Sequence, residues 1–350
     1  MSKTNSGHYF EDFSVGMKLV HATPRTVTVG DVALYNGLYG PRFAVQSSDA
    51  FAQAIGYPRA PVDDLIVFHM VFGKSVPDVS LNAVANLGYA ECLFGVPVYP
   101  GDTLSARSEV IGLKENSNGR TGVVYVRTSG FNQNDEEVLA YARWVMVHKR
   151  DPASPAPDPV VPDLASAVAA GDLPSRGLAP KPSGYEFALA GAGHRLNDYE
   201  VGEKINHADG VTLEEAEHQV ATRLYQNTAK VHFNAFEQQN SRFGRRLIYG
   251  GVIISLARAL SFNGLENAYK LLAINGGRHV APTFAGDTVS AWSEVLECRV
   301  IDGLEGAGAL RLRTIALKDC DPSTFARFNN DGHYADGVVL DMDYWVGVPT

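Results

Sequence analysis

The chain contains two regions in which β-branched and aromatic residues alternate partly with polar ones. A two-residue period of this kind is typical of antiparallel strands that bury one face. In the first region the turn-forming segment NQND (132–135) separates two such runs, which predicts a meander of consecutive strands. The predicted strands are residues 103–113, 123–131 and 138–148 in the first region and residues 288–300, 309–318 and 338–348 in the second.

An apolar segment of helix length precedes each group of strands. GGVIISLARALSF (250–262) has apolar side chains on nearly every side, and VDDLIVFHMVFG (62–73) is the aligned segment of the first half. Apolar residues all round are typical of a helix that is buried on every face. One long buried helix followed by an antiparallel meander describes the hot-dog fold, in which a sheet wraps around the helix. We therefore expect an α+β protein with a double hot-dog fold.

The two halves repeat each other in sequence. PVYPGDTLSARSEV (97–110) returns as PTFAGDTVSAWSEV (282–295) with nine of fourteen positions identical, and YFEDFSVGMKLVHA (9–22) matches RLNDYEVGEKINHA (195–208). A repeat at a fixed offset indicates a duplicated structural unit. We interpret the chain as an N-terminal hot-dog repeat (1–150), a Pro- and Ala-rich surface linker (151–184) and a C-terminal hot-dog repeat (185–350).

The composition narrows the classes of function. The 350-residue chain has a formal net charge of −9, which argues against a nucleic-acid partner because phosphate contacts need a basic face. Its apolar segments are too short to span a bilayer, so we expect no membrane partner and a cytoplasmic location. The cysteines Cys92, Cys298 and Cys320 and the histidines lack metal-ligand spacing, and no glycine-rich nucleotide loop is present. We expect neither a metal nor a separate cofactor.

The repeated GDT segment itself is expected to be structural. Gly101 and Gly286 mark a tight turn, and the carboxylates of Asp102 and Asp287 can accept hydrogen bonds from backbone N–H groups there. Both repeats need this turn in order to fold. A functional site is therefore expected where the two repeats differ.

The repeats differ after two aligned tyrosines. The second reads YQNTAKVHFNAF (225–236), where the first reads YGPRFAVQSSDAF (39–51). His232 faces Gln46 in this alignment and Asn227 faces Pro41, so only the second repeat has a side chain that moves protons near neutral pH. We expect one active site per chain, in the second repeat.

At these residues the chain resembles the MaoC-like hydratase and dehydratase family. The YFEDFSVG opening, the GDT turn and the segment before the buried helix carry the resemblance, which covers both halves apart from the linker. It implies a hydro-lyase that adds water reversibly across the double bond of an α,β-unsaturated acyl-CoA thioester. Its closest match is to the members that convert mesaconyl-CoA to β-methylmalyl-CoA.

The family signature Asp-x-Asn-Pro-x-His assigns roles to individual residues. Anchored on His232, it places Asn227 at the Asp position, Ala229 at the Asn position and Lys230 at the Pro position, so three of the four residues differ. The resemblance implies that His232 activates the water. Asn227 can only orient it, because an amide does not accept a proton. Either His232 performs both proton steps or a carboxylate such as Glu237 replaces the missing Asp.

The start of the buried helix supplies a second element of the expected site. Family members commonly have His-Gly where this chain has Tyr249-Gly250, and the Gly250 N–H at a helix N-terminus suits the oxygen of a thioester carbonyl. The first repeat has Asp63 and Asp64 at the aligned helix start, where negative charge would repel that oxygen. This difference indicates that the first site is degenerate.

Cationic residues are needed for the anionic parts of the substrate. The second carboxylate of mesaconyl-CoA needs a cation or several donors once it is buried. Lys230 is the first candidate, with Arg42 and Arg245 as competitors. Arg278 and His279 are candidates for the phosphates of CoA, because they lead into the GDT strand.

Three other functions remain compatible with these residues. They are an (R)-specific enoyl-CoA hydratase for straight-chain acyl groups, a hot-dog acyl-CoA thioesterase, and an acyl-CoA-binding protein without catalytic activity. The acyl-CoA is the expected partner in every case. A homodimer is a further possibility, because oligomers of such proteins are commonly symmetric.

Overall fold

A single antiparallel sheet of ten strands forms the frame of the protein in the computed structural model, which describes residues 3–301 and 306–350. The strand order is β1-β3-β4-β5-β2-β7-β10-β9-β8-β6, so each half of the chain contributes five neighbouring strands. The first half forms β1 (Lys18–Thr26), β2 (Ala83–Phe94), β3 (Thr103–Glu115), β4 (Thr121–Phe131) and β5 (Glu137–His148). The second half forms β6 (Lys204–Thr212), β7 (Lys270–His279), β8 (Thr288–Val300), β9 (Ala307–Lys318) and β10 (Val338–Pro349).

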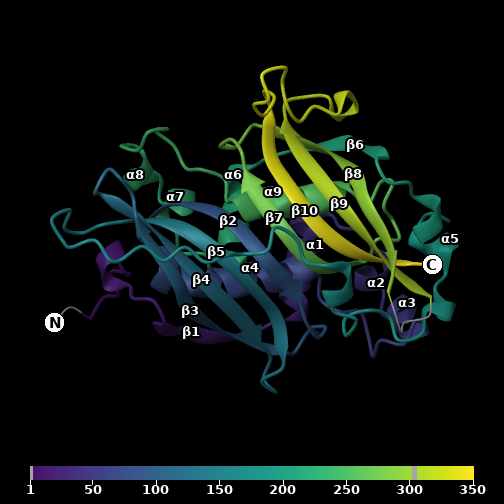
Figure 1. The fold of residues 1–350 in the computed structure, drawn as a ribbon. Coiled ribbons are helices and arrows are strands. Elements are labelled where there is room, and N and C mark those ends of the chain that lie inside the picture. Colours follow the sequence, from purple (N-terminus) through teal and green to yellow (C-terminus); the bar gives the residue numbers. More distant parts are fainter. Residues whose placement is uncertain (1–2, 302–305) are drawn as a thin grey trace.

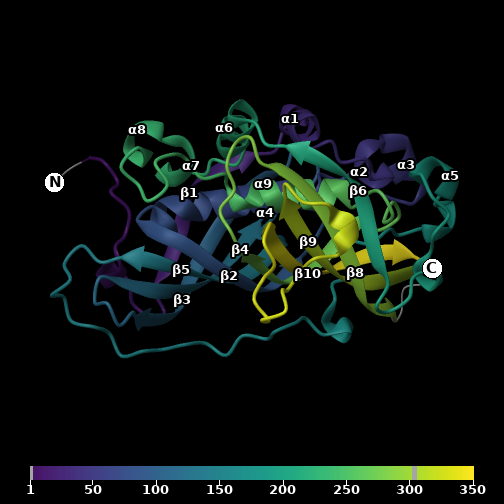
Figure 2. The same ribbon diagram turned by 90° about the horizontal axis from the view of Figure 1, so that it is seen from above.

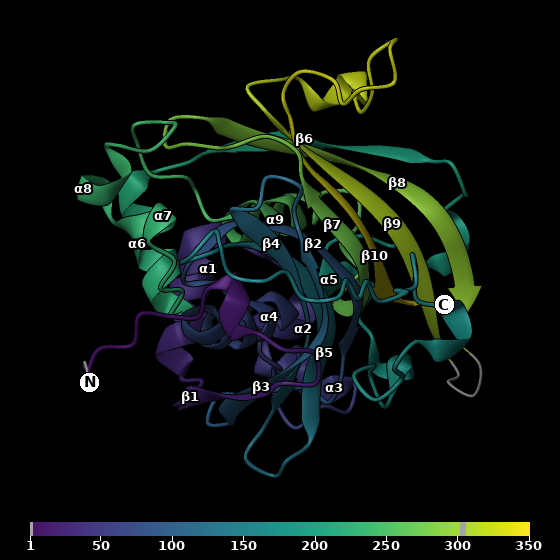
Figure 3. The ribbon, with the colours of Figure 1, turned by 60° about the vertical axis from the view of Figure 1, so that its left-hand side comes forward.

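Two buried helices lie side by side against one face of the sheet, which curves around them (Figures 1 and 3). They are α4 (Asp64–Ser75) and α9 (Gly250–Leu260), and every residue of α4 is buried. The six predicted strands and both predicted helices are present, so the predicted α+β double hot-dog arrangement is confirmed. The sequence had not predicted β1, β2, β6 and β7, and β1 is an edge strand with mostly exposed side chains.

The other helices form an outer layer over α4 and α9 on the side away from the sheet (Figure 2). None of the helices that the structure describes is long and apolar enough to cross a membrane. The outer helices are α1 (Val29–Tyr39), α2 (Ala44–Ser47), α3 (Asp49–Ala54), α5 (Phe187–Ala190), α6 (Glu215–Leu224), α7 (Lys230–Phe233) and α8 (Ala235–Gln238).

The first part of residues 151–184 runs along the side of the sheet opposite the helices (Figure 2). The last part reaches the end of α3, where the Lys181 N–H donates to the Ile55 carbonyl at 2.9 Å. Val160 forms a bridge with Leu113 of β3, and the Trp345 indole of β10 donates to the carbonyl of Val168 at 3.1 Å. The segment therefore spans both halves of the sheet and is fixed to each of them.

The repeated sequence builds the same buried contacts twice. The Nε2 atom of His21 lies 2.7 Å from the Ser108 hydroxyl, and that of His207 lies 2.8 Å from the Ser293 hydroxyl. In each GDT turn the aspartate accepts a backbone N–H, at 2.8 Å for Asp102 and 2.9 Å for Asp287. Because both halves keep these contacts, they account for the repeat by folding alone.

Candidate active site

The N-terminus of α9 presents backbone donors to the interior. Tyr249 is the N-cap residue and provides no side-chain cap, while its own N–H donates to Nε2 of His218 at 2.9 Å. Across the described ranges, the N–H groups of Gly250 and Gly251 have no hydrogen-bond acceptor. Free N–H groups at a helix start carry partial positive charge, so this end of α9 can bind an oxygen that gains negative charge.

His232 reaches this helix start from α7. Its Nδ1 lies 3.1 Å from the carbonyl oxygen of Leu247, and because a carbonyl only accepts, Nδ1 carries the proton. Nε2 is then unprotonated and available as a base. The ring lies 5.4 Å from the Tyr249 ring and 6.1 Å from the His218 ring, measured between centroids.

His279 packs directly against Gly250. A Cβ atom at position 250 would lie 2.4 Å from Cε1 of His279, so no side chain larger than hydrogen fits there without a shift. Nε2 of His279 is buried and has no hydrogen-bond partner in the part of the chain that the structure describes. An unpartnered polar atom is costly to bury, which indicates a place for a water or a substrate atom.

The imidazoles of this cluster are all neutral at pH 7. Burial lowers the pKa of His232 to about 4. Burial, together with the nearby His232 ring, lowers the pKa of His279 to about 4 and that of His218 to about 3. The cluster can therefore accept protons and hydrogen bonds without placing a cation beside the helix start.

Asn227 is buried at the turn before α7. Its Oδ1 accepts the N–H of Ala229 at 3.0 Å, which leaves the amide NH₂ group as its free donor. The side chain can therefore orient a water by donating to its oxygen. The water-orienting role of Asn227 stays a prediction from the sequence.

Lys230 and Glu237 do not lie in the buried cluster. The Lys230 ammonium is 3.3 Å from the Glu237 carboxylate, and both side chains are about half exposed, at 53% and 47%. They interact with each other at the surface, where a strongly hydrated ammonium is most stable. The structure thus corrects the expectation that Lys230 binds a buried carboxylate and that Glu237 replaces the missing Asp.

Arg42 and Arg245 are also exposed and lie over aromatic rings. The guanidinium carbon of Arg42 is 4.6 Å from the Phe262 ring centroid, and that of Arg245 is 3.7 Å from the Phe284 ring centroid. These stacking contacts hold both side chains against the outside of the protein. Neither arginine is placed with the imidazoles at the start of α9.

A groove of about 620 Å³ opens where β2 and β7 separate. The two strands pair only at Cys92–Ile274 and Leu93–Ala273, and beyond these pairs the gap is lined by Tyr89, Arg278 and His279 among others. Successive side chains of a strand point to opposite faces. Arg278 is exposed, whereas His279 reaches inward to Gly250, so His279 is shared by the groove lining and the imidazole cluster.

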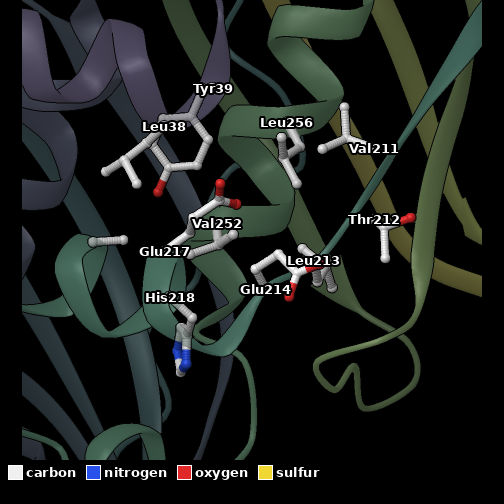
Figure 4. Close-up of a pocket in the computed structure, with 11 residues that line it drawn as sticks. Leu38, Tyr39, Val211, Thr212, Leu213, Glu214, Glu217, His218, Val252 and Leu256 are labelled. Atoms are coloured by element: carbon white, nitrogen blue, oxygen red, sulfur yellow. The ribbon is translucent and has the colours of Figure 1, made fainter.

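A second pocket lies between α1, α6 and α9 (Figure 4). Its volume of about 20 Å³ is close to that of one water position. Leu38, Val252 and Leu256 give it mostly apolar walls, and His218 lies at one end (Figure 4). The pocket is too small for an acyl group, whereas the groove between β2 and β7 is much larger.

The aligned helix start of the first half is closed by its own carboxylates. Asp63 accepts the N–H of Leu65 at 2.8 Å, and burial, with Asp64 beside it, raises the pKa of Asp63 to about 6. Asp64 forms a buried ion pair with Lys270 and accepts the N–H of Leu271 at 3.0 Å. These carboxylates disfavour a substrate oxygen that gains negative charge at this helix start.

Sequence reasoning missed the roles of His218 and Tyr249 and misplaced His279, which it assigned to the phosphates. A signal for His218 was present, because His218, Ala221, Thr222 and Tyr225 follow helical spacing and all four are buried. A histidine on the buried face of an amphipathic helix needs a partner. No comparable sequence signal places His279 against Gly250.

The double hot-dog fold, with imidazoles gathered at the start of one of two buried helices, fits the class of MaoC-like hydratases and dehydratases. A model of the mesaconyl-CoA hydratase family matches residues 1–327. The chain belongs to this family. It is 60% identical over 348 residues both to the β-methylmalyl-CoA dehydratase of Chloroflexus aurantiacus and to the mesaconyl-CoA hydratase of Cereibacter sphaeroides, with 99% of each chain covered.

Solved structures agree with this assignment. A MaoC domain protein dehydratase from Chloroflexus aurantiacus superposes with a TM-score of 0.96 at 59% identity, over 100% of this chain and 99% of that one. A protein from Mycobacterium tuberculosis, described as having a double hot-dog fold, superposes with a TM-score of 0.77 at 25% identity, over 98% and 99% of the two chains. The fold and the family that the sequence predicted are therefore confirmed.

Proposed function

We propose that the protein catalyses the reversible hydration of mesaconyl-CoA to β-methylmalyl-CoA at the N-terminus of α9. The observation that carries this proposal is the neutral, unprotonated Nε2 of His232 next to a helix start whose N–H groups are free. Hydration of a conjugated thioester needs a base for water and donors for the thioester oxygen. Both are present in the second half, and the relatives named above act on this pair of compounds.

The reaction is divided among three groups. His232 Nε2 takes a proton from water while the water oxygen bonds to the β-carbon of the double bond, and the NH₂ group of Asn227 orients that oxygen. The electron pair of the double bond moves toward the thioester carbonyl, whose oxygen is stabilised by the Gly250 N–H and the helix start. The imidazolium of His232 then returns its proton to the α-carbon, which balances the addition and leaves the base neutral.

The CoA portion is proposed to occupy the groove between β2 and β7. Arg313 and Arg327 both pair with Asp341 there, at 3.3 and 2.9 Å. Arg278 has no ion pair within residues 3–301 and 306–350 and stacks on Tyr334 at 5.4 Å. Its charge is thus available for a phosphate. The exposed Arg42 and Arg245 would contribute only at the outer parts of the substrate.

We propose that the two repeats supply different parts of the site. Residues 185–350 supply the base and the helix start, and residues 1–150 supply a wall of the site through β2 and α4. The linker of residues 151–184 connects them. A cytoplasmic location and a homodimer stay predictions from the sequence.

The test is an assay of the purified protein with mesaconyl-CoA. We expect the absorbance of the conjugated thioester to fall without release of free thiol, and His232→Ala to lower kcat by about 10²- to 10⁴-fold. Thiol release at the same rate would instead indicate a thioesterase. Binding without turnover would indicate a binding protein, and faster turnover of crotonyl-CoA would indicate a straight-chain enoyl-CoA hydratase.

A further inference from the structure

Arg143 of β5 is a buried cation without a counter-ion. The residue is 0% exposed, and its Nη2 lies 2.9 Å from the Ser75 hydroxyl and 3.4 Å from the Ser80 hydroxyl. Nε and Nη1 are buried and form no hydrogen bond with any residue that the structure describes. Within the same ranges Arg143 has no ion pair. The guanidinium carbon lies 4.3 Å from the centroid of the Phe72 ring.

A buried guanidinium without a counter-ion lowers the stability of the folded protein. Burial disfavours the charged form and lowers the pKa of Arg143, yet a guanidinium stays protonated in proteins. An unpaired buried charge costs several kcal/mol, on the order of the penalty for breaking a buried ion pair. The arrangement therefore indicates that an anion joins Arg143 during function.

Arg143 lies close to the start of α9. The Phe72 ring on which it stacks is 5.9 Å from the Tyr249 ring and 6.2 Å from the Tyr89 ring, measured between centroids. The hydroxyl groups of Tyr89 and Tyr249 are near enough to interact with its charge. Tyr89 also lines the groove and lies 6.3 Å from the His279 ring. Through the Phe72 ring, Arg143 is thus linked to Tyr249 at the helix start and to Tyr89 in the groove.

At the helix start of the first half, a buried arginine from the second half lies within electrostatic range of carboxylates of the chain itself. Tyr249 and Gly250 align with Asp63 and Asp64 at an offset of 186 residues. Beside those two aspartates lies Arg258, which is also buried and interacts with both carboxylates. The closed helix start therefore combines a buried arginine with carboxylates from the chain itself.

The open helix start has the buried arginine but no carboxylate of its own. Arg143 lies within electrostatic range of the Tyr249 hydroxyl, and its neighbours are tyrosines and serines. If the two starts are built alike, the carboxylate that is missing at the open one must come from the ligand. Mesaconyl-CoA carries such a carboxylate on the carbon that receives the water.

We propose that Arg143, contributed by the first half, receives the second carboxylate of the substrate and so selects dicarboxylic enoyl thioesters. This inference rests on the proposed function and names the residue that sets its specificity. The pairing compensates the buried guanidinium only when substrate is bound. It also fixes the β-carbon at a set position relative to His232, because the carboxylate is attached to that carbon.

The test compares mesaconyl-CoA with tiglyl-CoA, which has a methyl group in place of the second carboxylate. In Arg143→Met we expect the ratio of kcat/KM for mesaconyl-CoA to that for tiglyl-CoA to fall by about 100-fold or more, as for loss of one partner of a buried charge pair. Arg107→Met is the matched control, because Arg107 also stacks on a ring, that of Phe131 at 4.6 Å, but is exposed. It should leave the ratio unchanged.

A second measurement separates binding from folding. Because the free protein leaves Arg143 unpaired, Arg143→Met should keep or raise the unfolding midpoint without ligand, whereas a purely structural arginine would lower it. If Arg143→Met does not fold, the inference is tested with the Arg143→Lys variant instead. It keeps a charge but loses the planar fork, so its ratio should fall by about tenfold. An unchanged ratio in that variant would overturn the inference.

Equal loss of both activities in Arg143→Met, or a fall in the ratio caused by Lys230→Met instead, would also overturn it. Failure of the proposed function looks different, since the wild-type protein would then not hydrate mesaconyl-CoA at all. In that case the saturated thioesters methylsuccinyl-CoA and 2-methylbutyryl-CoA still test the pocket by calorimetry. The first should bind wild type much more tightly than the second, and Arg143→Met should remove the difference.

Discussion

At the scale of single residues, the site depends on where protons sit before substrate arrives. The Leu247 carbonyl fixes the proton of His232 on Nδ1, and the Tyr249 N–H occupies Nε2 of His218, so that His218 carries its proton on Nδ1. Both rings are neutral, but only His232 has its unprotonated nitrogen free. This difference is why one imidazole is assigned as the base and its neighbour as a support for the helix start.

The pH dependence of activity follows from the burial of His232. Its pKa is lowered from the ordinary 6.5 to about 4, so the base stays unprotonated well into the acid range. We expect kcat/KM to be level between pH 8 and pH 5 and to fall near pH 4. A profile falling near pH 6.5 would show that His232 is not held in this buried state.

The same shifts affect stability, and circular dichroism at each pH is the control. The folded-state pKa values of His232, His218 and His279 lie below 6.5. The unfolded chain therefore binds protons first, and the free energy of unfolding is fully retained above pH 6.5 and decreases as the pH falls toward 4. The kcat/KM values are compared only at pH values where circular dichroism shows that the protein is folded.

At the scale of elements, the N-terminus of α9 is accessible because its first two residues are glycines and have no side chain. Gly250 has the His279 ring where a Cβ would be, and Gly251 has Tyr249 and His69 atoms within 2.5 Å of its own Cβ position. Rings can therefore approach the helix start from two sides. The two glycines are needed for space and for access to their N–H groups.

Gly250→Ala tests this close approach. The added methyl group must displace His279 or the first turn of α9, so we expect kcat/KM to fall by about 100-fold and the free energy of unfolding to fall by about 1–3 kcal/mol. Stopped assays and denaturant unfolding would measure these two effects.

Gly37→Ala in α1 is the matched control, since nothing lies within 4 Å of a Cβ there. An alanine in an exposed helix should raise the free energy of unfolding by up to about 1 kcal/mol and leave the activity unchanged. Equal behaviour of the two variants would contradict the packing of His279 on Gly250.

At the scale of the whole molecule, the halves are joined mainly by buried side chains. β2 and β7 pair at only two positions. Between the halves, the Tyr225 hydroxyl donates to that of Tyr39 at 3.0 Å, and Asp64 of α4 pairs with Lys270 of β7. The groove can therefore lie between these two strands while buried side chains connect the halves.

Lys270→Met tests the buried connection. It leaves the Asp64 carboxylate buried without its cation, and we expect the free energy of unfolding to fall by about 3–5 kcal/mol in denaturant titrations. A second change, Asp64→Asn, should recover part of the loss by removing the uncompensated charge. The exposed pair of Arg107 and Asp135 is the comparison, and its loss in Arg107→Met should cost about 0.2–1 kcal/mol. Equal losses in both variants would contradict a buried role for Lys270.

The sequence by itself determined the duplicated fold and pointed to His232 as the proposed base. Apolar periodicity depends on local burial, so it correctly predicted the six meander strands and both buried helices, and the difference between the repeats singled out His232. The partly exposed edge strand β1 escaped prediction because its pattern is weak.

Only the tertiary structure decided which charges are buried. Lys230 lies two residues from His232 but points to Glu237 at the surface, whereas Arg143 lies 89 positions before His232 and is enclosed near the same helix start. Desolvation depends on what every other segment places around a side chain, and neighbours in sequence carry little of that information. The placement of His279 against Gly250 was decided in the same way, by the register of β7 beside α9.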